Sequence, residues 1–200
     1  MKLSVAMAAL CLITVGSDPA GTPTPRQPDA TRDAPITQVA APEPPLTEVK
    51  VGEPAPDFSY QSPDGRWRNL HDLLAQGPVL LVFGGDDVVL GTLEHERDRL
   101  LDLGVIPVAI LDVRPGTAWS AVRRLHLRYS VLADPQRVIG AQFNIVDPAT
   151  RRHLPGWFVI DRSRTVRGLE RGRLPDDEYP ALASKSLGIP LPGVTLPTAQ

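Results

Sequence analysis

Two apolar runs separated by one helical stripe constrain the fold more than any other feature of the chain. Residues 79–83 form a continuous apolar run, and residues 105–111 form a second. Runs of this kind, without polar alternation, are typical of strands that are buried on both faces of a sheet. Between them, apolar residues recur at helical spacing from Leu90 to Leu103, and Gly104 ends the stripe. The order strand, helix, strand predicts a right-handed parallel crossover.

Turn residues predict a hairpin on each side of this unit. The segment Ser62-Pro63-Asp64-Gly65 has Pro and Gly where tight turns favour them, between strands predicted over residues 58–61 and 66–69. A second hairpin is predicted over residues 157–169, with its turn at residues 162–164.

Periodic segments complete the predicted architecture. Helices are predicted over residues 71–75, 117–127, 134–143 and 176–187, and one further strand over residues 129–132. Pro135 would occupy the first position of its helix, where its missing N–H costs nothing. The pattern predicts an α/β sandwich with a mixed sheet.

The N-terminus has the features of an export signal. Lys2 precedes an apolar stretch from Leu3 to Val15, and small residues follow, so residues 1–17 are predicted to be a signal peptide cleaved after Ser17. The stretch is shorter than a membrane-spanning helix requires. The sequence therefore predicts a secreted or periplasmic protein, with membrane contact only if the N-terminus is retained or Cys11 is lipidated.

Proline dominates the next segment. Eight of the 22 prolines lie between Pro19 and Pro45, and no aromatic residue occurs before Phe58. A segment with so little to bury cannot offset its ordering entropy, so residues 18–48 are predicted to be a disordered linker. By the same reasoning residues 188–200 form a tail, which leaves residues 49–187 as the folded domain.

Cysteine usage and charge exclude several kinds of function. Cys11 is the only cysteine, so an intrachain disulfide, a CxxC redox pair and a multi-cysteine metal site are excluded. The net charge of -2 gives no overall electrostatic reason to expect nucleic acid or an anionic membrane as partner. Five arginines between Arg162 and Arg173 leave two alternatives open, a patch for an acidic partner or neutralisation within the domain.

Several ordered motifs resemble the AhpC/TSA peroxiredoxin and redoxin family. They are residues 51–58 (VGEPAPDF) with the turn that follows, the strand at 79–83, residues 129–135 (YSVLADP) and residues 158–162 (FVIDR). The resemblance covers roughly residues 51–187. It implies a thioredoxin-like fold, with a central mixed sheet, an N-terminal hairpin and flanking helices, and thiol-based oxidoreductase activity.

The residues that carry chemistry in that family are replaced here. Its pattern Pro-x-x-x-Thr-x-x-Cys falls on Gly85, Val89 and Thr92, so Thr92 stands where the reactive thiol would be. The family's arginine position holds Pro155, which resembles instead the cis-proline of thioredoxins. We therefore expect a cis Leu154–Pro155 bond, with Pro155 beside Thr92.

These positions define the candidate site. We expect Asp86, Asp87, Thr92, Pro155 and Trp157 to form a groove that binds a protein or peptide partner. The other two tryptophans, Trp67 and Trp119, are expected in the core or at its edge, and His71, His126 and His153 on the surface or in packing roles.

Two other interpretations of the helix start remain open. Thr92 and His95 are three residues apart and could form a dyad on one helix face, whereas the simpler role for Thr92 is to cap the helix. A metal site is the second interpretation, because carboxylates and imidazole suit divalent cations; its ligands would come from Asp86, Asp87, Glu94, His95 and Glu96. The simpler alternative is that the acids stay solvated and complement the helix dipole.

Three functions follow from this pattern. The first is an exported redoxin-like domain without redox cysteines and without a cofactor, which binds a partner or acts as a scaffold. The second is a redoxin-family oxidoreductase with peroxiredoxin- or thioredoxin-like antioxidant activity, as the resemblance implies. The third is an enzyme without a thiol that uses Thr92, His95 or a metal.

Overall fold

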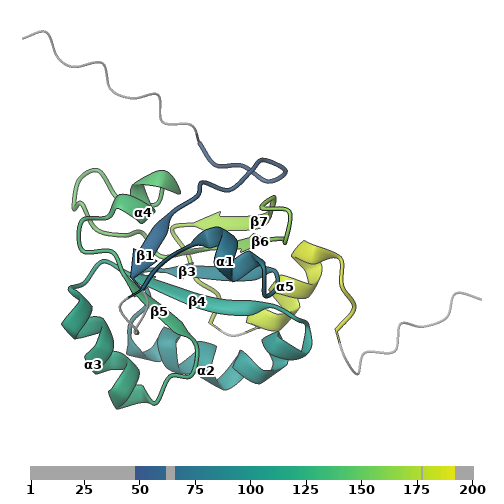
Figure 1. Cartoon of the computed structure of the whole chain (residues 1–200), viewed down its shortest axis with the longest axis horizontal. Helices are drawn as coiled ribbons and strands as arrows, with labels where there is room; N and C mark the ends of the chain where they lie inside the picture. The colour runs from purple at the N-terminus through teal and green to yellow at the C-terminus, as the bar shows by residue number, and fades with distance from the viewer. Residues whose placement is uncertain (1–47, 62–65, 177, 192–200) are drawn as a thin grey trace, which may run out of the picture. The chain divides into compact units, whose positions relative to one another are not determined.

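Strand β3 (Val79–Phe83) is the centre of a five-stranded sheet with the order β5-β4-β3-β6-β7 (Figure 1). In a computed structural model that describes residues 48–61, 66–176 and 178–191, β3 pairs in parallel with β4 (Ile106–Leu111) and antiparallel with β6 (Gly156–Ile160). Strand β5 (Ser130–Ala133) continues the parallel half, and β7 (Val166–Arg171) continues the antiparallel half. The predicted parallel pair and the C-terminal hairpin are therefore confirmed.

Five helices and a small hairpin surround this sheet in the described residues. The hairpin joins β1 (Ser59–Gln61) and β2 (Trp67–Asn69) antiparallel, with Tyr60 opposite Arg68. The turn predicted at residues 62–65 lies outside the described residues. The helices are α1 (Leu70–Leu74), α2 (Asp87–Asp102), α3 (Pro115–Leu125), α4 (Val138–Gln142) and α5 (Tyr179–Leu187).

Alternation along β3 divides the interior into two cores. Leu80 and Val82 pack with residues of α2, α3 and α5, including Leu90, Ala118 and Ala183. Their neighbours Val79, Leu81 and Phe83 pack with α1, α4 and the hairpin. Because all five side chains of β3 are buried, the run has no polar residue on either face.

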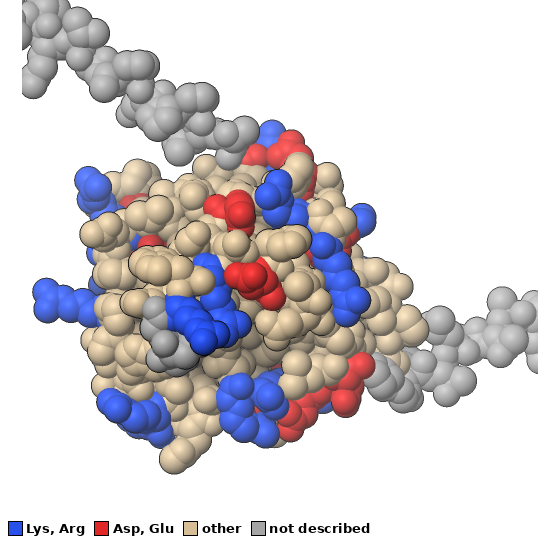
Figure 2. Space-filling view, in the orientation of Figure 1, with Lys and Arg blue, Asp and Glu red and all other residues tan. Residues whose placement is uncertain are grey.

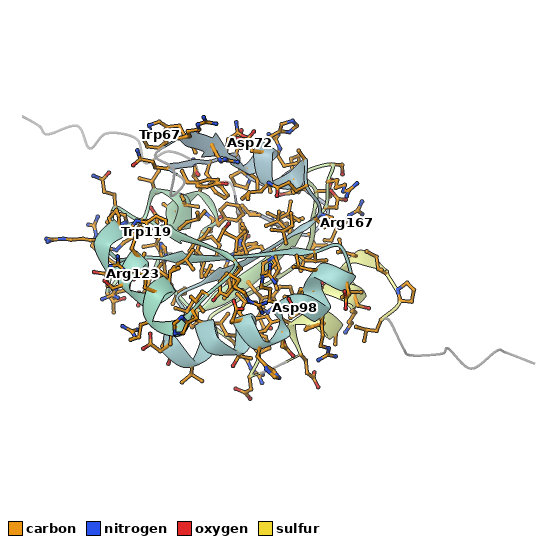
Figure 3. The ribbon with its side chains drawn as sticks, turned by 60° about the horizontal axis from the view of Figure 1, so that its bottom comes forward. Trp67, Asp72, Asp98, Trp119, Arg123 and Arg167 are labelled. Carbon is orange, nitrogen blue, oxygen red and sulfur yellow. The ribbon has the colours of Figure 1, made fainter. Side chains whose placement is uncertain are left out.

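The layers can be followed in the side-chain view. Trp67 of β2 and Asp72 of α1 lie on one side of the sheet, and Asp98 of α2 lies on the other (Figure 3). The thioredoxin-like sandwich predicted from the sequence is thus the observed fold. No helix within the described ranges is both long and apolar enough to cross a membrane.

Two predicted helix starts are wrong. Helix α4 begins at Val138 rather than at Asp134-Pro135, because Arg137 adopts a left-handed conformation (φ 59°) and the Asp134 carboxylate reaches the Gly140 N–H instead of capping a helix at Pro135. Helix α5 begins at Tyr179 rather than Asp176, after a left-handed Glu178 (φ 74°).

Trp67 is not a core residue. Its side chain is 73% exposed, because it stands at the end of the hairpin opposite Gln61 rather than over the main sheet. Trp119 is half-buried on α3, and Trp157 is buried on β6.

Candidate functional site

The loop between β3 and α2 is shaped by Gly84 and ended by Asp86. Gly84 has a φ of 71°, and a Cβ there would lie 3.1 Å from the Leu154 carbonyl oxygen and 3.3 Å from the Pro155 Cα. Asp86 then caps α2, and its Oδ1 accepts hydrogen bonds from the Val88 and Val89 N–H groups, both at 3.0 Å. The loop before β6 therefore lies directly against the loop that leads into α2.

The Leu154–Pro155 bond is trans, so the prediction of a cis bond is wrong. The chain runs extended into β6: the Leu154 N–H donates to the Ile145 carbonyl at 2.8 Å, and the Pro155 carbonyl accepts from the Gly172 N–H at 2.7 Å. A trans bond, the usual form of X–Pro bonds, satisfies this extended path. The resemblance to a thioredoxin cis-proline fails at this position, and Gly84 lies close to Pro155.

Thr92 lies inside α2 and not at its cap. Its hydroxyl donates to the Val88 carbonyl at 3.0 Å, a bond to the preceding turn of the same helix. Capping by Thr92 is therefore wrong, because Asp86 has that role. His95, on the next turn, is exposed, and the Thr92 hydroxyl bonds to the backbone rather than to His95.

Asp87, the first residue of α2, is paired across the helices. Both of its carboxylate oxygens accept hydrogen bonds from Arg124 Nη2 of α3 at 2.6 Å. Both side chains are more than half exposed, which limits such a pair to about 0–1 kcal/mol. The pair ties α3 to the start of α2.

Trp157 lies in the core that Leu80 and Val82 of β3 form with the helices α2, α3 and α5. It belongs to the cluster that packs with α2 and α5, whereas Phe158 belongs to the opposite one. Its ring lines a cavity of about 480 Å³ together with Lys185 and Ser186 of α5. Of these positions, Pro155 thus lies against Gly84, two residues before Asp86, while Trp157 borders the α5 side of the sheet.

The acids predicted as alternative metal ligands have other partners. Glu94 accepts from the Arg128 Nε at 2.5 Å and from the Arg128 N–H at 2.8 Å. Glu96 accepts from the Tyr179 N–H at 2.8 Å. Within the described part of the chain, no three His, Cys, Asp or Glu residues are grouped so as to hold a metal ion. Glu94 and Glu96 are therefore engaged by other groups of the domain.

Charge on the visible face is mixed. Figure 2 shows Lys and Arg side chains beside Asp and Glu side chains, with uncharged surface between them. Around the C-terminal hairpin, Arg167 Nε donates to Asp161 Oδ2 at 2.6 Å, and Arg171 donates to the carbonyls of Val49 and Phe143. Arg167 is thus neutralised by an acid of the domain, as the neutralisation alternative has it, whereas Arg171 bonds to uncharged carbonyls.

Comparison with known proteins decides the family. Residues 51–169, more than half of the chain, match the AhpC/TSA family. The chain belongs to the AhpC/TSA family. A Synechocystis protein with a peroxiredoxin name is 25% identical over 153 residues, which are 66% of this chain and 76% of the relative. A Mycobacterium tuberculosis protein with such a name is 29% identical over 129 residues, 59% of this chain and 82% of the relative.

Solved structures show the same fold. The crystal structure of peroxidoxin BcpB from Mycobacterium tuberculosis superposes with a TM-score of 0.62 at 22% identity, over 71% of this chain and 96% of that one. Enterococcus faecalis AhpC superposes with a TM-score of 0.58 at 14% identity, over 69% and 90% of the two chains.

One buried polar pair in this AhpC/TSA domain was not singled out from the sequence. Asp134 follows β5, and its Oδ2 lies 3.1 Å from His153 Nε2; the side chains are 5% and 0% exposed. The His153 ring stands edge-on to Phe83 at 5.5 Å between centroids. Asp134 follows a strand at the carboxyl edge of the parallel half of the sheet, where α/β proteins often place polar groups, and this was the available signal.

Electrostatics confirm that the pair is tightly held. Burial raises the pKa of Asp134, but hydrogen bonds from His153 and from the Gly140 N–H outweigh it and hold the pKa below its ordinary value. Just after β4, burial likewise raises the pKa of Asp112, and hydrogen bonds from Arg152 and from the His153 N–H, together with nearby positive charge, more than reverse the effect. The packing role expected for His153 therefore includes a charged partner.

Proposed function

We propose that this AhpC/TSA-family domain is a binding or scaffolding domain that performs no thiol chemistry. Its partner is a protein or peptide, and its binding surface is the region predicted from the sequence, namely Asp86, Asp87, Thr92, Pro155 and Trp157. The approach of Pro155 to Gly84, two residues before Asp86, supports a surface shared by Pro155 and the loop that leads into α2.

The state of Thr92 carries this proposal. A peroxidatic site needs a thiolate, which helix N-terminal amides stabilise and which cycles through sulfenic acid. Here the aligned residue is a threonine whose hydroxyl donates to the Val88 carbonyl, and the amides of Val88 and Val89 are occupied by Asp86. No cysteine follows Cys11 in the sequence. A hydroxyl held in this way has neither the acidity nor the redox chemistry of a thiol.

A second candidate is thiol-dependent oxidoreductase activity through Cys11. The peroxiredoxin names of the relatives favour this class more than they favour a binding domain. Cys11 lies outside the described residues, so this candidate stands on the family alone.

One assay separates the two candidates. The full chain and its Cys11→Ser variant are compared for hydrogen peroxide consumption and insulin reduction, with dithiothreitol as electron donor. We expect both proteins to match the background of a heat-denatured sample. Activity in the full chain that disappears in Cys11→Ser would establish the second candidate. Activity that survives in Cys11→Ser would overturn both and direct attention to Thr92 and His95.

We also propose that the chain is exported, on the strength of the apolar segment from Leu3 to Val15. Mass spectrometry of protein recovered from the host should then find a chain that starts near Asp18. A chain that starts at an acylated Cys11 would replace secretion with membrane tethering, and an intact Met1 would rule out cleavage.

A further inference from the structure

A groove runs along the free edge of the sheet, away from the start of α2. Strand β5 pairs only with β4 among the described strands, so it is an edge of the main sheet. Beside it lies a cavity of about 430 Å³, bounded by the β1–β2 hairpin, α3 and α4. A second cavity of about 660 Å³ adjoins it and shares Tyr60, Trp119 and three neighbouring residues. We call the first cavity the β5 groove.

Apolar side chains are left exposed on this groove. Trp67 and Val138, which both line it, are 73% and 55% exposed. Tyr60 and Trp119 add further aromatic surface, and Figure 3 labels Trp67 on the hairpin and Trp119 on α3. Aromatic-lined grooves of this kind are typical docking sites for polyproline II segments. Large apolar side chains that gather at one exposed site indicate an interaction surface.

The position at which the chain enters the domain indicates the occupant. The Val49 N–H donates to Asn144 Oδ1 at 2.9 Å, and Asn144 lies just after α4. Val138 and Gln142 of the same short helix line the β5 groove. Residues immediately before Val49 therefore enter the domain at the end of the helix that forms one wall of the groove.

The sequence before this entry point suits the groove. Residues 43–47 read Glu-Pro-Pro-Leu-Thr, with three consecutive apolar residues, Pro44, Pro45 and Leu46. Proline favours the extended polyproline II helix, at a low entropic cost of docking. Five residues in that conformation span about 16 Å, whereas the five residues of α4 span only about 8 Å. The segment is long enough to run back along α4 into the groove.

We propose that residues 43–47 of this chain dock in the β5 groove, with Pro44 and Pro45 against Trp67 and Trp119. The docked segment covers the exposed ring of Trp67 and the half-buried ring of Trp119, and it lies along the edge of the sheet at β5. The proposal does not depend on whether the domain has thiol activity, because the groove and the start of α2 are formed by different residues.

Indole signals test this in the full chain. Its three tryptophans give three indole N–H resonances in a nitrogen-15 spectrum, and Trp157, buried in the core of α2 and α5, is the internal control for folding. In a Pro44→Ser/Pro45→Ser variant, we expect the Trp67 and Trp119 signals to move and to gain broadening from a soluble paramagnetic agent, while Trp157 stays unchanged. A Pro23→Ser/Pro25→Ser variant, with the same substitutions further upstream, should leave all three signals in place.

A groove variant provides the reciprocal test. Val138→Ser removes an apolar side chain from the groove wall, and Val88→Ser is its matched control, since Val88 is an exposed valine on α2. We expect the amides of Glu43, Leu46 and Thr47 to become more mobile in the Val138→Ser variant, by nitrogen-15 relaxation, and to be unchanged in Val88→Ser.

Each contrary outcome overturns the proposal. Unmoved Trp67 and Trp119 signals in the Pro44→Ser/Pro45→Ser variant would mean that residues 43–47 do not dock. Equal effects from the upstream prolines would assign the groove to another part of the linker. A dependence of the signals on protein concentration would assign it to a second copy of the chain.

Discussion

Glu96 of α2 accepts hydrogen bonds from the backbone N–H groups at the start of α5, from Tyr179 at 2.8 Å and from Glu178 at 3.2 Å. Helix α5 has no side-chain cap of its own, because Glu178 is left-handed and points no oxygen at these groups. The carboxylate is 5% exposed, and Arg99 Nη1 lies 3.6 Å from it. Glu96 of α2 therefore satisfies backbone N–H groups at the start of α5, and its negative charge interacts favourably with the dipole of that helix.

Loss of this carboxylate should destabilise the domain. We expect Glu96→Ala to lower the free energy of unfolding by about 1–3 kcal/mol, because buried N–H groups lose a charged acceptor. Asp102→Ala, at the exposed end of the same helix, should change it by less than about 0.5 kcal/mol. Urea denaturation followed by circular dichroism measures both. Equal effects from the two variants would contradict a capping role for Glu96.

Two glycine substitutions should act in opposite directions. Gly84→Ala places a Cβ 3.1 Å from the Leu154 oxygen at a φ of 71°, so a loss of about 1–2 kcal/mol of unfolding free energy is expected. Gly91→Ala, inside α2 with open space around its Cα, should add about 0.5–1 kcal/mol. Thermal unfolding of the two variants shows whether each substitution raises or lowers stability. A stabilising effect of Gly84→Ala would show that a Cβ at position 84 does not clash with Leu154.

The Asp134–His153 pair should make the free energy of unfolding depend on pH in the acidic range. The pKa of Asp134 is lowered in the folded state, so its contribution is fully present above its ordinary value of 3.8 and is lost as the pH falls through the folded-state pKa. Asp134→Asn should therefore be less stable than the parent near pH 7, by about 1–3 kcal/mol, and should lose less further stability between about pH 5 and pH 3.

Urea midpoints at several pH values measure this difference. The parent's acid dependence should not vanish in Asp134→Asn, because the pKa of Asp112 is also lowered, by Arg152. Parallel pH profiles for the parent and the variant would show that Asp134 does not contribute.

A thiol placed at position 92 should remain an ordinary thiol. Thr92 lies beyond the first turn of α2, and Asp86 accepts hydrogen bonds from the Val88 and Val89 N–H groups of that turn, so little stabilises a thiolate there. In Thr92→Cys/Cys11→Ser we expect the rate of iodoacetamide alkylation to rise with a midpoint near the ordinary cysteine pKa of about 8.5, without peroxidase activity. A midpoint below about 7 would mean that the family's thiolate-stabilising field has been retained.

The strands were predictable because burial on both faces leaves a strong pattern. The runs at β3 and β4 contain no polar residue, and each lies within one residue of its predicted bounds. The start of α4 was not predictable, because Asp134-Pro135 has the composition of a helix start, whereas tertiary contacts direct the Asp134 side chain to Gly140 and His153.

The candidate site was predictable only in part. Asp86 and Asp87 were placed at the start of α2 from their position after β3, but the cap was assigned to Thr92 instead of Asp86. The exposure of Trp67 was not, since the hairpin's place beside α3 and α4 depends on packing between distant segments. The same reason hid the Glu96–Tyr179 contact, which joins residues 83 positions apart.

Strand order also has a consequence for synthesis on the ribosome. The centre of the sheet, β3, has one neighbour that follows it closely in the chain and another, β6, that emerges only after β4, β5 and α4. While the chain grows, one edge of its most apolar strand has no hydrogen-bonding partner, and open edges of this kind recruit other chains. The nascent polypeptide therefore has a long interval in which this edge of β3 is open to pairing with other chains.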